Sequence, residues 1–82
     1  MINFENLISS LILPLVAYPN DFEIIKEEAS TEDDLKFKVL VNQADLGRVI
    51  GREGHIAKAI RTVLYAGASK EGKRVHLDID AR

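Results

Sequence analysis

The chain has 82 residues and no cysteine, and 46% of its residues are hydrophobic. This length predicts a single domain over residues 1–82, and the lack of thiols excludes disulfides and zinc–thiolate sites. The net charge of −2 hides an asymmetry, because residues 1–43 hold eight acidic and three basic side chains whereas residues 44–82 hold five and eight. No apolar run approaches the roughly 18 residues of a membrane span and no basic leader is present, so we expect a cytoplasmic protein without membrane contact.

The first predicted element is a helix from residue 3 to about residue 17. Asn3 is a suitable N-cap. Apolar residues then recur at spacings of three and four, namely Phe4, Leu7, Ile8, Leu11, Ile12 and Leu15. Such spacing places them along one side of a helix, where they are expected to enter the core or, alternatively, to form a groove for a partner helix. Pro14 removes a backbone donor and residues 18–21 are typical of a turn, so the helix should kink or end there.

A β-hairpin is predicted next. Residues 22–28 alternate imperfectly between polar and apolar, and residues 35–41 alternate clearly, with an acidic turn at 29–34 between them. Such alternation predicts two strands that each have one apolar face. Leu40 interrupts the largely basic face of the second strand, and we expect it either to be exposed without consequence or to take part in a contact.

Two helices and a third strand follow. A short helix should begin with Asp45 as its N-cap and end at Gly51, and a longer one should run from Gly54 to about Ser69. Residues 75–80 alternate again and predict the last strand. The order is therefore α-β-β-α-α-β. Three strands covered on one face by three amphipathic helices give a two-layer α+β fold.

Gly51 and Gly54 flank the junction between the two central helices. Glycine has no Cβ, so it accepts positive φ and lets another backbone come close. The first N–H groups of the helix that follows have no intrahelical partner. A turn of this kind can hold a phosphodiester backbone, which predicts a nucleic-acid site. The structural alternative is that both glycines simply make an ordinary helix-to-helix turn.

Residues 49–54 (VIGREG), followed by residues 58–61 (KAIR), resemble the GXXG loop of a KH domain, a loop that clamps about four nucleotides. Together with residues 46–48 (LGR) and 72–75 (GKRV), they make nearly the whole chain similar to the small stand-alone bacterial KH-domain RNA-binding proteins of the KhpA type. The resemblance implies a type II KH fold and single-stranded RNA as ligand. It also implies a homodimer, a heterodimer with a second, larger KH-domain RNA-binding protein, and a role in post-transcriptional regulation linked to cell elongation and division.

The predicted RNA site surrounds this loop. The two glycines would let the RNA backbone approach, and Arg52 would contact a phosphate oxygen. Ile50 and Ile56, with an aliphatic residue of the strand at 35–41, would support the bases, and Lys58 and Arg61 would extend the basic rim. The full predicted set is Arg48, Ile50, Gly51, Arg52, Glu53, Gly54, His55, Ile56, Lys58 and Arg61. His55 is either a ligand contact or an ordinary surface residue at the helix start.

Two acidic features oppose phosphate binding. Glu53 lies within the loop itself, and the turn at residues 32–34 (EDD) occupies the place of the family's variable loop, which should face the GXXG loop across the cleft. We therefore expect weak, salt-sensitive binding of RNA by one copy, on the order of micromolar or weaker.

The sequence does not predict catalysis. Asp78 and Asp80 share one face of the last strand and would suit a divalent cation, but no third ligand is evident nearby. We expect no metal, no cofactor and no small-molecule substrate. Two other functions remain open: a protein-interaction (dimerisation) module with a degenerate KH cleft, which salt titration would distinguish, and a helix-hairpin-helix DNA binder, which would prefer duplex DNA.

Overall fold

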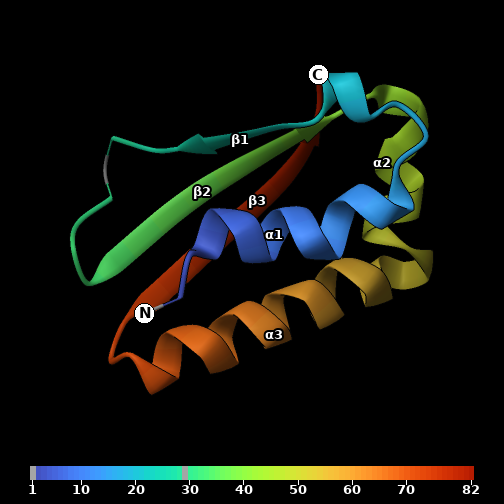
Figure 1. The fold of residues 1–82 in the computed structure, drawn as a ribbon. Helices are drawn as coiled ribbons and strands as arrows, with labels where there is room; N and C mark the ends of the chain where they lie inside the picture. Colours follow the sequence, from blue (N-terminus) through green and yellow to red (C-terminus); the bar gives the residue numbers. More distant parts are fainter. Residues whose placement is uncertain (1, 29) are drawn as a thin grey trace.

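The computed structural model describes residues 2–28 and 30–82, and its longest extent is 35 Å. Its elements are α1 (Phe4–Ile12), the 3-10 turns η1 (Leu13–Leu15) and η2 (Pro19–Asp21), β1 (Glu23–Lys26), β2 (Asp34–Val41), α2 (Gln43–Ile50), the 3-10 turn η3 (Arg52–Gly54), α3 (His55–Lys70) and β3 (Arg74–Ala81). Figure 1 shows α1 and α3 along one face of the sheet, with α2 at the end where β2 finishes. The predicted α-β-β-α-α-β order and two-layer α+β fold are confirmed.

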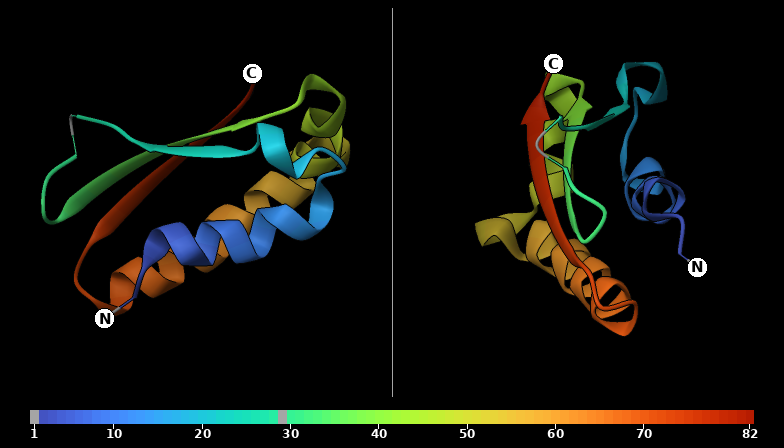
Figure 2. Two further views of the ribbon diagram at one scale, coloured as in Figure 1. Left: turned by 45° about the horizontal axis from the view of Figure 1, so that its top comes forward. Right: turned by 90° about the vertical axis from the view of Figure 1, so that its left-hand side faces the viewer.

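The sheet has the order β1-β2-β3, with β1 antiparallel and β3 parallel to the central strand β2. The antiparallel pair is the predicted hairpin. A parallel pair needs a long crossover, which α2 and α3 supply between β2 and β3. The crossover lies on the face of the sheet that α1 also covers, and the two views in Figure 2 show this layer from two sides.

The core lies between this helical layer and the inner face of β2. Four alternate residues of β2 are at most 7% exposed, namely Leu35, Phe37, Val39 and Val41. They belong to one cluster with Ile8 and Ile12 of α1 and with Ile60 and Leu64 of α3. The apolar residues that recur at every second position of β2 thus pack against those that recur every three or four positions in the helices.

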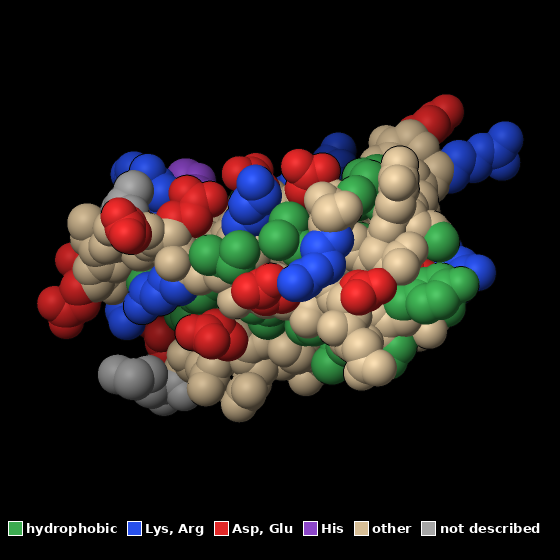
Figure 3. Space-filling model, turned by 90° about the horizontal axis from the view of Figure 1, so that it is seen from above, with side chains coloured by type: hydrophobic (Ala, Val, Ile, Leu, Met, Phe, Trp, Pro, Cys, Tyr) green, Lys and Arg blue, Asp and Glu red, His purple; other side chains and the backbone are tan. Residues whose placement is uncertain are grey.

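The opposite face of the sheet is polar. His76 Nε2 lies 2.9 Å from Asp34 Oδ1 across β2 and β3, and Leu40 is half-buried, paired in register with Glu23 and Asp80 of the neighbouring strands. Over the part of the surface seen in Figure 3, acidic and basic side chains are interspersed and the hydrophobic ones form small separate patches.

The first helix is shorter than predicted, because α1 ends at Ile12 and continues as the 3-10 turn η1 instead of reaching residue 17. Pro14 cannot donate the backbone hydrogen bond that an α-helix requires at that position, and its ring crowds the preceding turn. Asn3 is the N-cap as predicted, since its side chain accepts a hydrogen bond from the Asn6 N–H at 3.0 Å.

Two further boundaries differ from the predictions. β1 covers only residues 23–26 of the predicted 22–28, and Ala29, the first residue of the predicted acidic turn, lies outside the described residues. Asp45 is not the N-cap of α2. That position is held by Asn42, whose Oδ1 accepts from the Ala44 N–H at 2.8 Å while its Nδ2 donates to Asp21. None of the described helices is long and apolar enough to span a bilayer.

Candidate nucleic-acid interface

The turn between α2 and α3 has an unusual backbone. Gly51 has φ 77° and ψ 175°, Glu53 has φ 57°, and Gly54 has φ 77°. Positive φ is disfavoured for residues that carry a Cβ, which explains both glycines. The Gly51 N–H still closes α2 by donating to the Gly47 carbonyl at 2.9 Å, and the Gly54 N–H donates to the Gly51 carbonyl at 3.1 Å. The turn is therefore tight and ordered by its own backbone.

The two glycines face different surroundings. A Cβ placed on Gly51 would lie 2.5 Å from Cγ1 of Ile56, so the first glycine is required by packing as well as by its φ. A Cβ placed on Gly54 would meet no atom within 4 Å. The turn is thus closed on the side of Ile56 and open beside Gly54, where a ligand backbone can approach.

The side chains at the tip of the turn point into solvent. Arg52 and Glu53 are exposed, and within the described residues no hydrogen bond or ion pair engages the Arg52 guanidinium. Glu53 Oε2 lies 3.7 Å from Nε2 of His55, and both side chains are about three-quarters exposed. Arg52 is consequently available to an anion, and the negative charge of Glu53 remains beside it.

Lys58 and Arg61 do not have the same role. Lys58 is exposed on α3, as the predicted basic rim requires. Arg61 is half-buried, and its Nε donates to the Leu77 carbonyl of β3 at 3.1 Å. Arg61 therefore joins α3 to the outer edge of β3. The remaining N–H groups of its guanidinium are the part that a ligand would contact.

The apolar part of the predicted site needs one correction. Ile50 is half-buried and Ile56 is 37% exposed at the turn, so these two residues do lie beside the loop. The aliphatic residues on the inner face of β2 cannot join them, because β2 is the central strand and their side chains fill the core, and Leu40 lies on the opposite face of the sheet. The strand that borders α3 is β3, where Ile79 is partly buried.

The acidic turn does not face the GXXG loop. Residues 32–34 lie at the beginning of β2, whose first residue is Asp34, and the loop follows α2, beyond the other end of β2. The two are therefore separated by about the length of an eight-residue strand, roughly 26 Å. Figure 1 shows them at opposite ends of the molecule. The predicted cleft between the loop and this turn is therefore wrong, whereas Glu53 lies within the loop itself.

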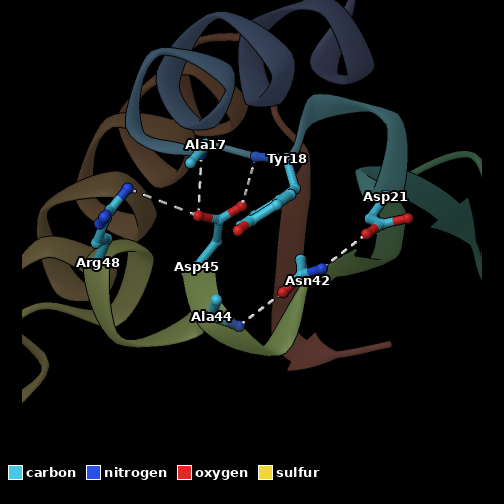
Figure 4. Close-up of polar contacts among 7 residues, drawn as sticks. All are labelled: Ala17, Tyr18, Asp21, Asn42, Ala44, Asp45 and Arg48. Atoms are coloured by element: carbon cyan, nitrogen blue, oxygen red, sulfur yellow. Dashed lines mark hydrogen bonds and ion pairs between the residues drawn. The ribbon is translucent and has the colours of Figure 1, made fainter.

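Asp45 supports the site from behind, a role that sequence reasoning missed. It is fully buried, and its carboxylate accepts hydrogen bonds from the Ala17 N–H at 2.9 Å and the Tyr18 N–H at 3.0 Å (Figure 4). Arg48 NH1 lies 3.8 Å from the same carboxylate. Asp45 precedes the buried Val49 by four residues, and this spacing was the available signal that it faces the core.

Arg48 belongs to the predicted RNA site. Its guanidinium lies beside the carboxylate of Asp45, although its side chain is 64% exposed. The structure brings residues 50–56 together at one end of α3 and places Lys58 one turn further along the helix. Among the described residues, no group of three or more His, Asp or Glu side chains is arranged to hold a metal ion.

A KH domain of type II is defined by two helices that are joined by a GXXG turn and that connect one strand to its parallel neighbour. A model of the family described as "KhpA/KhpB, KH domain" matches residues 5–79. The chain belongs to this family. As predicted for a domain of this family, the chain is not an enzyme.

Similar proteins include the RNA-binding protein KhpA of Listeria monocytogenes, which is 49% identical over 75 residues, 92% of this chain and 96% of the relative. The RNA-binding protein KhpA of Bacillus subtilis is 38% identical over 94% of this chain and 93% of its own length. The protein of the same name from Streptococcus pneumoniae is 38% identical over the full length of both chains. The predicted likeness to proteins of the KhpA type is confirmed.

Proposed function

We propose that this protein binds single-stranded RNA, with the Gly51–Gly54 turn holding the sugar–phosphate backbone. The observation that carries the proposal is the turn itself: open space beside Gly54, an unengaged arginine at its tip, and the start of a long helix behind it. Relatives that align over nine-tenths of the chain or more are named RNA-binding proteins, which supports the same ligand.

Charge and surface chemistry favour a single strand held by its backbone. Arg52 in the turn and Lys58 in the first part of α3 are exposed cations, and Ile56 at the start of α3 is an exposed apolar residue. A KH loop of this kind clamps about four nucleotides. Because Glu53 adds a negative charge next to the phosphates, we expect affinity of one copy on the order of micromolar and a steep dependence on salt.

The test is the double substitution Arg52→Asp, Glu53→Asp, assayed by fluorescence anisotropy with a labelled single-stranded RNA. Both side chains are exposed, and Asp is tolerated at the left-handed position of residue 53, so the variant should fold. We expect RNA binding to be lost. The matched control is Lys26→Asp, which changes the net charge equally at an exposed position of β1. A folded double variant that still binds like the parent would refute the proposed site.

Matched single-stranded DNA and duplex DNA belong in the same assay at two salt concentrations. Preference for RNA that weakens with salt supports phosphate contacts by the turn. Preference for duplex DNA would instead support the helix-hairpin-helix alternative. An affinity that does not change with salt concentration would indicate contacts other than those to phosphate.

A protein-interaction role is a second candidate, because α3 carries exposed apolar side chains outside the loop. Ile56, beside the loop, is 37% exposed and Val63 is 45% exposed, and their spacing of seven residues places them on one side of α3. We propose a homodimer, or a heterodimer with a larger KH-domain RNA-binding protein, as the resemblance implies. Sedimentation velocity across a concentration series tests the first, and a constant monomer mass would contradict it.

The proposed cellular role is post-transcriptional regulation in the cytoplasm, linked to cell elongation and division. It rests on RNA binding, so the double variant Arg52→Asp, Glu53→Asp should reproduce the effects of deleting the gene on cell length. A variant that fails to bind RNA and yet restores normal length would separate the cellular role from the loop.

A further inference from the structure

A hollow lies at the far end of α3, away from the GXXG turn, where α3 passes the beginning of β3. Its volume is about 270 Å³, and it is lined by Tyr65, Ala68, Lys73, Arg74, Val75 and His76. None of these residues belongs to the predicted RNA site. Tyr65 is 47% exposed, so its ring is accessible from solvent.

One side of α3 connects this hollow with the turn. Lys58, Arg61, Tyr65 and Ala68 follow one another at spacings of three and four, which places them along one side of the helix. Arg61 shows that this side faces β3, since it donates to the Leu77 carbonyl. The hollow therefore lies on the same surface as the turn, with about 16 Å of helix between Gly54 and Tyr65.

The edge of β3 completes the floor of the hollow. Arg74 and Arg82 donate their backbone N–H groups toward the central strand, to Asp33 and Val41 respectively. Because alternate residues of a strand direct these groups to opposite sides, the N–H and C=O of Val75 lie on the outer edge, beside the hollow. A base placed there would meet a backbone donor, a backbone acceptor and an aromatic ring.

The surroundings favour a nucleotide over an apolar protein segment. Lys73 and Arg74 supply two cations at the rim, and His76 is held in place by Asp34 at 2.9 Å. A single aromatic ring with adjacent cations is the combination that holds single-stranded nucleic acid by stacking and phosphate contact. A hollow of this size accommodates one planar group and not a helix.

We propose that this hollow is a second nucleotide subsite, in which Tyr65 stacks on a base of an RNA that continues past the GXXG turn while Lys73 and Arg74 contact its phosphates. The subsite rests on the proposed RNA-binding function and extends it along α3. It predicts that RNA longer than the clamped segment binds more tightly, because the additional nucleotides reach Tyr65.

The test compares Tyr65→Ala with Tyr18→Ala. Tyr18 is the matched control, because it is 51% exposed and lies outside α3 and β3. Each variant is titrated with an RNA of about four nucleotides, the length that a KH loop clamps, and with one about twice as long. We expect Tyr65→Ala to weaken binding of the longer RNA by roughly 5- to 150-fold, the range for losing one stacked base, and to leave the shorter RNA unaffected.

Other outcomes overturn the proposal. Equal weakening for both lengths would make Tyr65 part of the clamp, and an unchanged affinity for the longer RNA would leave no stacking role. A change in sedimentation without a change in RNA affinity would assign the hollow to a protein contact. If the parent protein binds neither RNA, the proposed function itself fails, and this result differs from all of these.

Intrinsic fluorescence offers a second readout, because the chain has two tyrosines and no tryptophan. In a Tyr18→Phe variant, emission comes from Tyr65 alone, and in Tyr65→Phe it comes from Tyr18 alone. We expect the longer RNA to quench the first variant and not the second. Equal quenching in both variants, or none in either, would contradict stacking on Tyr65.

Discussion

Two exposed turns lie at opposite ends of this molecule and are built in different ways. The turn at residues 51–54 is shaped by backbone conformation, with three positive φ angles in four residues. The turn between β1 and β2 is shaped by side chains: the Ser30 hydroxyl bonds both the N–H and the C=O of Lys36, and Thr31 Oγ1 accepts from the Asp34 N–H.

The 51–54 turn leaves a side chain available to a ligand, whereas side chains of the β1–β2 turn bond the backbone of the protein itself. In the β1–β2 turn the hydroxyl groups of Ser30 and Thr31 bond the neighbouring backbone. In the 51–54 turn the glycines define the path of the chain, so the guanidinium of Arg52 stays unengaged within the described structure. The acidic side chains of residues 32–34 are therefore separated, by the length of β2, from the turn that we propose to hold phosphates.

The largest effect should come from Gly51→Val. A β-branched residue is strained at φ 77°, and its Cβ would lie 2.5 Å from Ile56. We expect a loss of about 3 kcal/mol in the free energy of unfolding, measured by urea denaturation. Gly54→Ala is the matched control, since open space surrounds it, and should cost only about 1 kcal/mol for its positive φ. Similar losses at both positions would contradict the unequal roles of the two glycines.

A smaller effect is expected for Asp45→Ala, which tests how α2 is held behind the loop. The change leaves the N–H groups of Ala17 and Tyr18 without their partner, and we expect the free energy of unfolding to fall by about 2 kcal/mol. Ser30→Ala is the comparison at the other turn and should cost about 1 kcal/mol, because its two hydrogen bonds are only partly buried. Thermal and urea unfolding measure both. A larger loss for Ser30→Ala would reverse the comparison.

The smallest effect concerns charge and compares the two turns directly. Glu53→Gln should strengthen RNA binding by about threefold, because it removes a negative charge near the bound phosphates. Asp33→Asn removes the same charge at the other end of the molecule, beyond the Debye length of about 10 Å at 0.1 M salt, and should leave affinity unchanged. Anisotropy titrations at that salt concentration measure both variants. Equal strengthening would show that the acidic turn acts on the site after all.

Local patterns in the sequence predicted much of this protein. The alternation in residues 35–41 predicted β2 and its buried face, and the spacing of apolar residues after Gly54 predicted α3 almost to its last residue. The two glycines predicted a turn with positive φ between helices. These features follow from the periodicity of strands and helices and from the missing Cβ of glycine. None of them depends on distant parts of the chain.

The tertiary structure determined which elements and side chains are neighbours. The parallel pairing of β2 with β3 made β3 the strand beside α3, brought Arg61 to Leu77, and left the acidic turn at the far end of the sheet. It also buried Asp45 against the backbone of residues 17 and 18. The sequence by itself determined the elements and the GXXG turn, because short-range sterics and periodicity act within each segment. Only the packed fold determined the neighbours of that turn, because pairing across long loops depends on the whole core.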